Sequence, residues 1–141
     1  MVKQRMPVVA AFFCAVLGLT ACGTPKQDKS LDHTLNQYEQ VIRWSQWDAA
    51  LDFLAPEYMI ENPITTLDMD RLRLFRVTGY IGRSRIAIEG GMAVMQVVEL
   101  RLFNRNRAVE QRIIDQQLWR YHPKEERWML HSGLPDPTQR N

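Results

Sequence analysis

The chain has 141 residues, with 18 basic and 16 acidic side chains and a formal net charge of +2. Both surplus charges, Lys3 and Arg5, lie in the first 21 residues, so the rest of the chain is formally neutral. Neutrality removes the main electrostatic support for binding nucleic acid, and the length allows a single domain with its own core.

The N-terminal segment has the layout of a bacterial export signal. Lys3 and Arg5 precede 13 residues, Pro7 to Leu19, that are all apolar, proline or glycine, and the small residues Thr20 and Ala21 follow. A membrane-spanning helix needs about 20 apolar residues, so an uncleaved anchor is the less favoured interpretation.

The segment Leu19-Thr20-Ala21-Cys22 resembles the lipobox of bacterial lipoproteins, in which an aliphatic residue and two small ones precede an invariant cysteine. The resemblance implies cleavage after Ala21, attachment of diacylglycerol to the Cys22 sulfur and acylation of the new amino group. Each buried methylene contributes about 0.8 kcal/mol, so several acyl chains would hold the protein durably on a membrane. The alternative is a chance cysteine behind an ordinary signal peptide.

The residue after the cysteine bears on location. In the usual sorting rule of the lipoprotein family, an aspartate there retains the protein at the inner membrane. Gly23 therefore favours the inner leaflet of the outer membrane, facing the periplasm. The alternative location is the periplasmic face of the inner membrane.

These features divide the chain into four parts. We expect a cleaved signal peptide over residues 1–21, a lipidated cysteine with a flexible tether over 22–30, a folded domain over 31–135 and a polar tail over 136–141. The only cysteines are Cys14 in the signal and Cys22 at the anchor. The folded domain then lacks a thiol, which excludes thiol catalysis and cysteine metal sites.

The first half of the domain predicts helices. Apolar residues recur at helical spacing from Leu31 to Trp44, and Ser30 is a suitable N-cap. A shorter helix follows, with Asp48 as its cap and Pro56 as its end. Residues 57–70 give a weaker pattern, in which Asn62-Pro63 indicates a turn and residues 67–70 a single helical turn.

The second half predicts strands. The expected strands cover residues 72–81, 85–89, 92–102, 108–121 and 128–132, and Gly90-Gly91 is a hairpin turn. Helices followed by consecutive hairpins indicate an α+β fold, with an antiparallel sheet and helices on one face.

A second resemblance covers residues 31–135. The helix pattern from Trp44 to Leu54, the alternation of Asp115, Gln117, Trp119 and Tyr121, and the segment from Trp128 to Ser132 resemble the NTF2-like (cystatin-like α+β cone) superfamily. The resemblance implies a curved sheet that wraps the N-terminal helices into a cone, which often encloses a pocket. A fold of this kind serves enzymes, binding modules and assembly subunits alike, so the resemblance does not select one of these classes.

Four polar residues are candidates for such a pocket. Asp115 alternates with apolar residues of its strand, and Gln96, Gln117 and His131 occupy comparable positions. Desolvation would raise the pKa of an inward carboxyl, as a general base requires. The alternative places Asp115 on the solvent face, or pairs it with a nearby arginine such as Arg112 or Arg120.

The histidines and tryptophans favour structural interpretations. The three histidines show no metal-ligand spacing, so we expect no metal, no cofactor and an ordinary surface or satisfied role for His131. The tryptophans are expected to lock helices to the sheet, with an apolar ligand pocket as the alternative. They are Trp44, Trp47, Trp119 and Trp128.

Charge is divided unevenly along the domain. Residues 30–70 hold eight acids and one base, whereas residues 71–127 hold twelve bases and six acids. In one interpretation the two halves face each other or are simply solvated. In the other, the basic half presents an arginine-rich surface to an anionic envelope partner.

We expect a membrane-anchored periplasmic lipoprotein that acts as a non-enzymatic binding or accessory module of the cell envelope. Its partners would be the membrane, through Cys22, and an envelope protein or a small apolar or anionic ligand. One alternative is a small isomerase or dehydratase that uses Asp115. Another is a structural lipoprotein subunit of a secretion assembly, and the oligomeric state stays open.

Overall fold

A computed structural model describes residues 25–139 and shows an α+β fold in which helices precede four strands. The helices are α1 (Pro25–Arg43), α2 (Trp47–Ala50), α3 (Pro56–Glu61) and α4 (Thr66–Arg73), with the 3-10 helix η1 (Leu51–Phe53) after α2. The strands are β1 (Phe75–Ile88), β2 (Ala93–Asn104), β3 (Val109–His122) and β4 (Arg127–Leu130), and the 3-10 helix η2 (Glu89–Gly91) joins β1 to β2. Cys22 and the expected cleavage site lie outside the described residues.

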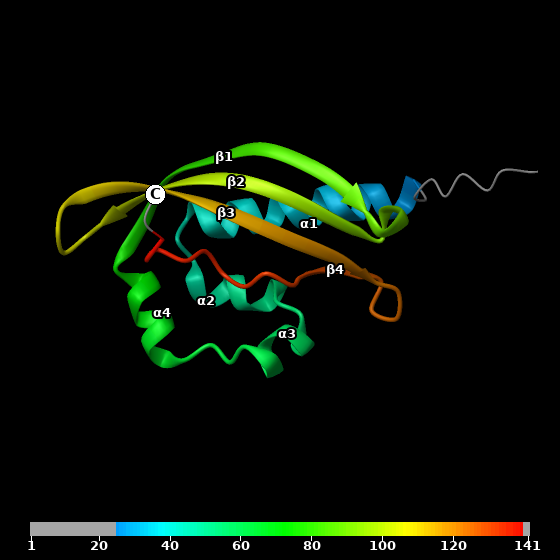
Figure 1. Ribbon diagram of the computed structural model, residues 1–141, viewed down its shortest axis with the longest axis horizontal. Coiled ribbons are helices and arrows are strands. Elements are labelled where there is room, and N and C mark those ends of the chain that lie inside the picture. Colours follow the sequence, from blue (N-terminus) through cyan, green and yellow to red (C-terminus); the bar gives the residue numbers. More distant parts are fainter. Residues whose placement is uncertain (1–24, 140–141) are drawn as a thin grey trace, which may run out of the picture.

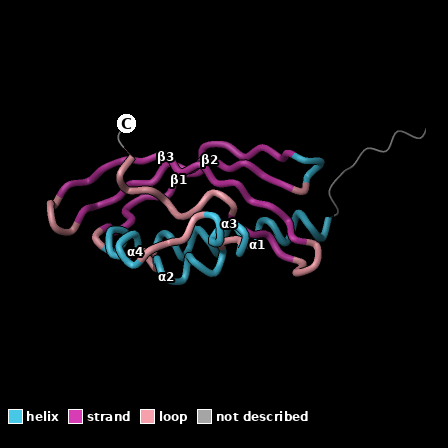
Figure 2. The backbone as a smooth tube through the Cα atoms, turned by 60° about the horizontal axis from the view of Figure 1, so that its bottom comes forward, coloured by secondary structure: helices cyan, strands magenta, loops and turns pink. Residues whose placement is uncertain are grey.

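The strands form one open antiparallel sheet in the order β1-β2-β3-β4. All four helices lie on the same side of this sheet, with α1 running along it (Figures 1 and 2). The predicted α+β class and antiparallel sheet are therefore confirmed. We call the side covered by the helices the inner face and the opposite side the outer face.

The core lies between α1 and the inner face. Tyr38 of α1 meets Trp119 of β3 edge to face, with ring centroids 5.1 Å apart, and Phe53 of η1 packs on Tyr38 at 5.3 Å. Trp47 is buried and donates its indole N–H to the Phe75 carbonyl at 3.2 Å. These large rings fix the helices on the sheet by burying apolar area on both layers.

The first helix begins six residues earlier than predicted, at Pro25. Proline suits a first helical position because its fixed φ matches the helix and its missing N–H costs nothing there. The Gln27 side chain donates to the Gly91 carbonyl at 3.2 Å, and Trp128 Nε1 donates to the Gln27 carbonyl at 3.3 Å. Residues 25–30 are therefore helical and bound to the sheet, and the expectation of a flexible tether is wrong for them.

The short helices differ from the predictions at their ends. Asp48 makes no cap hydrogen bond but pairs with Arg73 at 2.6 Å, and Pro56 begins α3 instead of ending a helix. The single turn expected at residues 67–70 is part of α4, which Thr65 starts with a capping box to Asp68.

The two strands predicted for residues 72–81 and 85–89 form a single strand, β1. Bulges between Val77 and Gly79 and between Gly82 and Ser84 let it continue beside β2 through the glycines.

Of the four tryptophans, three are buried as predicted, whereas Trp44 is 74% exposed at the end of α1. Within the described part of the chain, none of the helices has both the length and the apolar character needed to span a bilayer.

Candidate functional site

A row of polar side chains crosses the inner face of the sheet. Gln96 of β2 and Gln117 of β3 are direct cross-strand partners, and the Gln96 Nε2 donates to Gln117 Oε1 at 3.2 Å. Both amides also donate to the Tyr80 hydroxyl, each at 3.4 Å, and Trp119 Nε1 donates to Gln117 Oε1 at 3.1 Å. The row is therefore a network of hydrogen bonds among buried side chains, and Arg85 joins it from its exposed end by donating to Gln96 Oε1 at 3.2 Å. The low dielectric around the buried members strengthens their hydrogen bonds.

Asp115 lies at the β3 end of this polar row. It is 7% exposed and accepts a 2.7 Å hydrogen bond from Gln117 Nε2. Burial raises the pKa of Asp115 to about 6, although the hydrogen bond from Gln117 lowers it in part. The residue also lines a cleft of about 470 Å³ between β3 and the C-terminal segment, with Ser132 and Asp136 among its neighbours.

Three of the four predicted pocket residues thus come together. Gln96, Asp115 and Gln117 point inward, as their alternation with apolar neighbours predicts. Among the described residues, the hydrogen-bond partner of Asp115 is Gln117 and not an arginine, which was the alternative; Arg112 contacts Glu99 and Arg120 contacts Glu89. The fourth residue, His131, lies at a different place.

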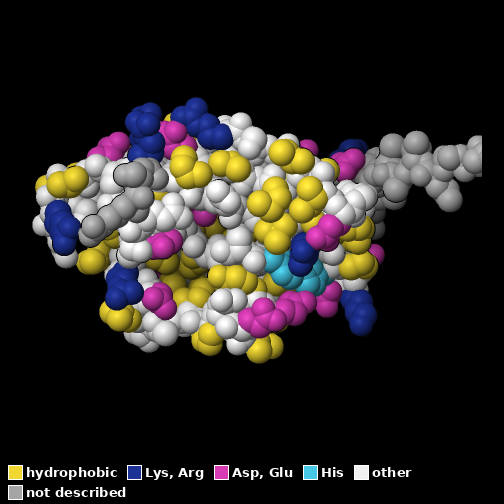
Figure 3. All heavy atoms as spheres, in the orientation of Figure 1, with side chains coloured by type: hydrophobic (Ala, Val, Ile, Leu, Met, Phe, Trp, Pro, Cys, Tyr) yellow, Lys and Arg dark blue, Asp and Glu magenta, His cyan; other side chains and the backbone are white. Residues whose placement is uncertain are grey.

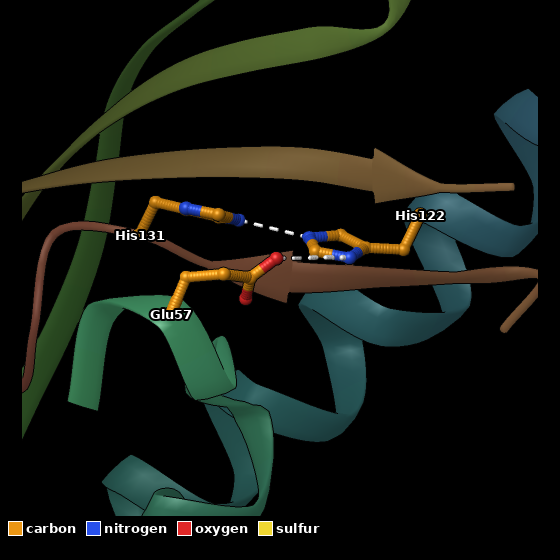
Figure 4. A group of neighbouring side chains, drawn as sticks. All are labelled: Glu57, His122 and His131. Atoms are coloured by element: carbon orange, nitrogen blue, oxygen red, sulfur yellow. Dashed lines mark hydrogen bonds and ion pairs between the residues drawn. The ribbon is translucent and has the colours of Figure 1, made fainter. Parts of the chain in front are cut away.

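His131 belongs to a cluster with His122 and Glu57 (Figure 4). The two histidines bring their Nε2 atoms within 2.9 Å of each other, and their rings stack at 5.2 Å. One carboxylate oxygen of Glu57 lies 3.8 Å from His122 Nδ1. Burial and the neighbouring His122 lower the pKa of His131. Histidine side chains gather at the surface beside acidic ones on the face drawn in Figure 3.

Three separate elements position this histidine cluster. His122 ends β3, His131 follows β4, and the antiparallel β3–β4 pair sets their separation. A bridge between Leu54 and Leu130, with a 2.9 Å hydrogen bond from Ala55 N–H to the Leu130 carbonyl, places the start of α3 beside β4. Sequence spacing did not predict the cluster. The sequence signal for it is that one histidine precedes the last turn and the other directly follows the last strand.

The outer face carries an arginine cluster around one carboxylate. Glu99 of β2 is only 4% exposed and is contacted by Arg83, Arg101 and Arg112. Arg83 Nε donates to Glu99 Oε2 at 3.2 Å and Arg112 Nε lies 3.2 Å from Oε1, and the hydrogen bond from Arg83 lowers the pKa of Glu99. The four side chains of this cluster together carry a net charge of +2.

Comparison with known proteins gave no match: neither a family model, nor a curated protein, nor a solved structure matches the chain.

The geometry of the described residues offers three distinct kinds of chemistry. The buried Asp115 could exchange a proton, the histidine cluster could hold a metal ion, and the arginine cluster could bind an anion.

Proposed function

We propose that this protein is a lipoprotein of the bacterial cell envelope, anchored through Cys22 in the inner leaflet of the outer membrane. The single observation that supports the anchor is the lipobox-like Leu19-Thr20-Ala21-Cys22 at the end of an apolar segment. The order of helices and antiparallel strands supports an NTF2-like domain behind this anchor. We propose that this domain is a binding module and not an enzyme.

The anchor is tested by fatty-acid labelling in living cells. A chain that is labelled with an alkyne fatty acid in the wild type should carry no label in Cys22→Ser. The matched control is Cys14→Ser, because that cysteine lies inside the expected signal and is removed with it. Equal labelling of the two variants, or an unlabelled wild type, would contradict the anchor.

The proximity of the domain to the anchor supports contact with the membrane itself. Helix α1 begins at Pro25, three residues after Cys22. Three residues span at most about 11 Å even when fully extended. The domain is thereby held at the lipid headgroups, and the partner we propose for its arginine cluster is the phosphate of anionic lipids.

The arginine cluster provides the charge for this contact. Arg83, Arg101 and Arg112 are each about half exposed at their side chains, so they reach solvent while sharing one buried carboxylate, Glu99. Arginine binds phosphate through paired N–H groups, and each basic residue near an anionic surface contributes about 1 kcal/mol. The described helices leave this face of the sheet uncovered (Figure 2).

Vesicle co-sedimentation tests the lipid contact. The Cys22→Ser chain without the expected signal, residues 1–21, lacks the acyl anchor and should bind vesicles of anionic phosphatidylglycerol and not of neutral phosphatidylcholine. Binding should disappear near 1 M salt, where the Debye length is about 3 Å. The pair Arg101→Gln and Arg112→Gln should weaken binding roughly 25-fold, at about 1 kcal/mol each.

Arg71→Gln is the control for each of the two substitutions made singly, because it removes one positive charge from α4, away from the outer face. Salt-independent binding, or equal loss in the control, would overturn the lipid contact. Retention of an acidic envelope protein without vesicle binding would also overturn it.

A second candidate function is proton abstraction by Asp115. The observation in its favour is a buried carboxyl whose pKa is raised to about 6 and which lines a cleft. Such a carboxylate could take a proton from carbon next to a carbonyl group and return it at another position, as an isomerase does. Gln117 and Tyr80 would orient the acid.

Deuterium exchange tests this candidate without a known substrate. In D₂O the wild-type chain should accelerate exchange of the α-protons of small enolisable ketones, and Asp115→Asn should lose that acceleration. Exchange at the same rate in both proteins would exclude Asp115 as a general base.

A further inference from the structure

We propose that Glu57, His122 and His131 form a binding site for one divalent transition-metal ion, with zinc as the first candidate. This inference goes beyond the lipid anchor and the arginine cluster and rests on neither. The three side chains each offer one ligand atom, and these atoms all lie within 4.8 Å of one another.

The two imidazoles have the arrangement that a metal requires. Their Nε2 atoms face each other at 2.9 Å, so one nitrogen must donate a proton to the other in the metal-free protein. Two nitrogens bound to one tetrahedral zinc, at about 2.05 Å each, lie about 3.3 Å apart. A metal ion could therefore replace the shared proton after the rings separate by a few tenths of an ångström.

Two carboxylates lie beside His122. Glu57 and Glu125 each place one oxygen 3.8 Å from His122 Nδ1. A carboxylate near Nδ1 favours the tautomer whose Nε2 is free to bind a metal, which is the usual outer-shell partner of a metal-bound histidine. We assign that role to Glu125 and the third ligand to Glu57, whose 61% exposed side chain has room to turn.

The surrounding charges also favour a cation. Arg120, which acts electrostatically on His131, pairs with Glu89 at 2.8 Å, and Arg127, the cross-strand partner of His122, donates to the Asp52 carbonyl at 2.6 Å. Each of these arginines thus has a partner other than Glu57 and Glu125. Two imidazole nitrogens and one carboxylate oxygen suit zinc, nickel or copper better than magnesium or calcium, which prefer oxygen ligands. Three protein ligands leave a fourth position for water.

Because the three ligands come from different elements of the fold, metal binding should stabilise the folded chain. Glu57 lies in the first turn of α3, whereas His122 ends β3 and His131 follows β4. A metal held by all three joins the helical layer to the edge of the sheet. Because the unfolded chain lacks the preformed site, the free energy of binding adds to the free energy of unfolding.

Zinc titration of the full chain tests the site. The protein is prepared without an affinity tag in mild detergent, and bound zinc is counted by elemental analysis after equilibrium dialysis. We expect one zinc per chain, a raised melting temperature with zinc and no displacement by magnesium. His122→Asn and His131→Asn should each weaken zinc binding by about tenfold or more and remove the thermal shift.

His33→Asn is the matched control, because His33 is exposed on α1 and outside the cluster. Far-UV circular dichroism checks that every variant is folded. Zinc binding that is unchanged in His122→Asn and His131→Asn, or absent at about 10 µM zinc in the wild type, would overturn the site. Wild-type affinity in Glu57→Gln would overturn the three-ligand arrangement.

Discussion

Gln117 donates a 2.7 Å hydrogen bond from its amide nitrogen to Asp115 Oδ2, and this contact is the only one that connects the carboxyl to the polar row among the hydrogen bonds of the described residues. The amide supports the charged form of Asp115, but burial opposes it more strongly and raises the pKa to about 6. A carboxylate in this position destabilises the fold at neutral pH. This cost is typical of groups that a functional site requires.

We predict that Asp115 makes the domain less stable as pH rises. Its pKa increases from 3.8 to about 6 on folding, so the folded chain binds the proton more tightly than the unfolded chain. The contribution of Asp115 is fully favourable below about pH 4 and is lost between about pH 4 and 6, by about 2–3 kcal/mol. Asp115→Asn should therefore raise the free energy of unfolding by about 2 kcal/mol at pH 7.

Urea denaturation of the two proteins between about pH 4 and 7 measures this difference. The two curves should approach each other toward pH 4, where Asp115 is protonated. Asp52→Asn removes an exposed carboxylate and should change stability by less than about 0.5 kcal/mol. An Asp115→Asn variant that is less stable than the wild type at pH 7 contradicts the prediction.

We predict opposite effects for the two buried tyrosines. The Tyr38 hydroxyl is fully buried and has no hydrogen-bond partner among the described residues, whereas the Tyr80 hydroxyl accepts from Gln96 and Gln117. Tyr38→Phe removes an unsatisfied polar group and should stabilise the domain by about 1 kcal/mol. Tyr80→Phe removes one of the two acceptors of each amide and should destabilise the domain by about 1–2 kcal/mol. Thermal and urea unfolding of both variants compare them, and a shift of the same sign in both would count against this account.

Gly133 is predicted to tolerate no side chain. Its φ of +82° is a left-handed conformation, and a Cβ there would meet the hydroxyl of Tyr58. Gly133→Ala should lower the free energy of unfolding by about 2 kcal/mol. Gly82→Ala is the matched control, since a Cβ at Gly82 meets open space and its change should be within about 0.5 kcal/mol. Comparable losses in the two variants would show that the position of Gly133 is not special.

Glu99 is predicted to stabilise the sheet at neutral pH. Its pKa is lowered in the folded chain by the hydrogen bond from Arg83, so its contribution is present above its usual pKa and is lost as pH falls below it. Glu99→Gln should lower the urea midpoint at pH 7 and tighten binding to anionic vesicles, because three arginines then lack their carboxylate. Glu110→Gln, an exposed acid of β3, controls for charge alone. A midpoint that shifts as much in Glu110→Gln as in Glu99→Gln would reject the role of the cluster.

The inner positions of Gln96, Asp115 and Gln117 could be predicted because they share the two-residue period of their strands with apolar neighbours. The length of β1 could not be predicted in the same way. Glycine interrupts a propensity pattern, yet here Gly79 and Gly82 are accommodated by bulges beside β2. Pairing with a neighbouring strand therefore outweighed local preference.

The residue at which the folded domain begins could not be predicted from local composition either. Residues 25–30 are small, polar and charged, which is typical of a tether, but the contacts of Gln27 with Gly91 and Trp128 join them to parts of the chain more than 60 residues away. Local composition does not predict such contacts, because they depend on where the η2 turn and β4 lie in space.

By itself the sequence determined the α+β class and the antiparallel sheet, since these follow from local periodicity. It left two alternatives open for Asp115, inward or on the solvent face, and the packing of the helices on the sheet decided between them. It also supplies the lipobox-like motif, on which the proposed anchor depends. Only the tertiary structure decided that His122 and His131 meet beside Glu57 and that three arginines surround Glu99. Both clusters join residues of different elements, so their formation depends on strand register and on the Leu54–Leu130 bridge, which no spacing along the chain encodes.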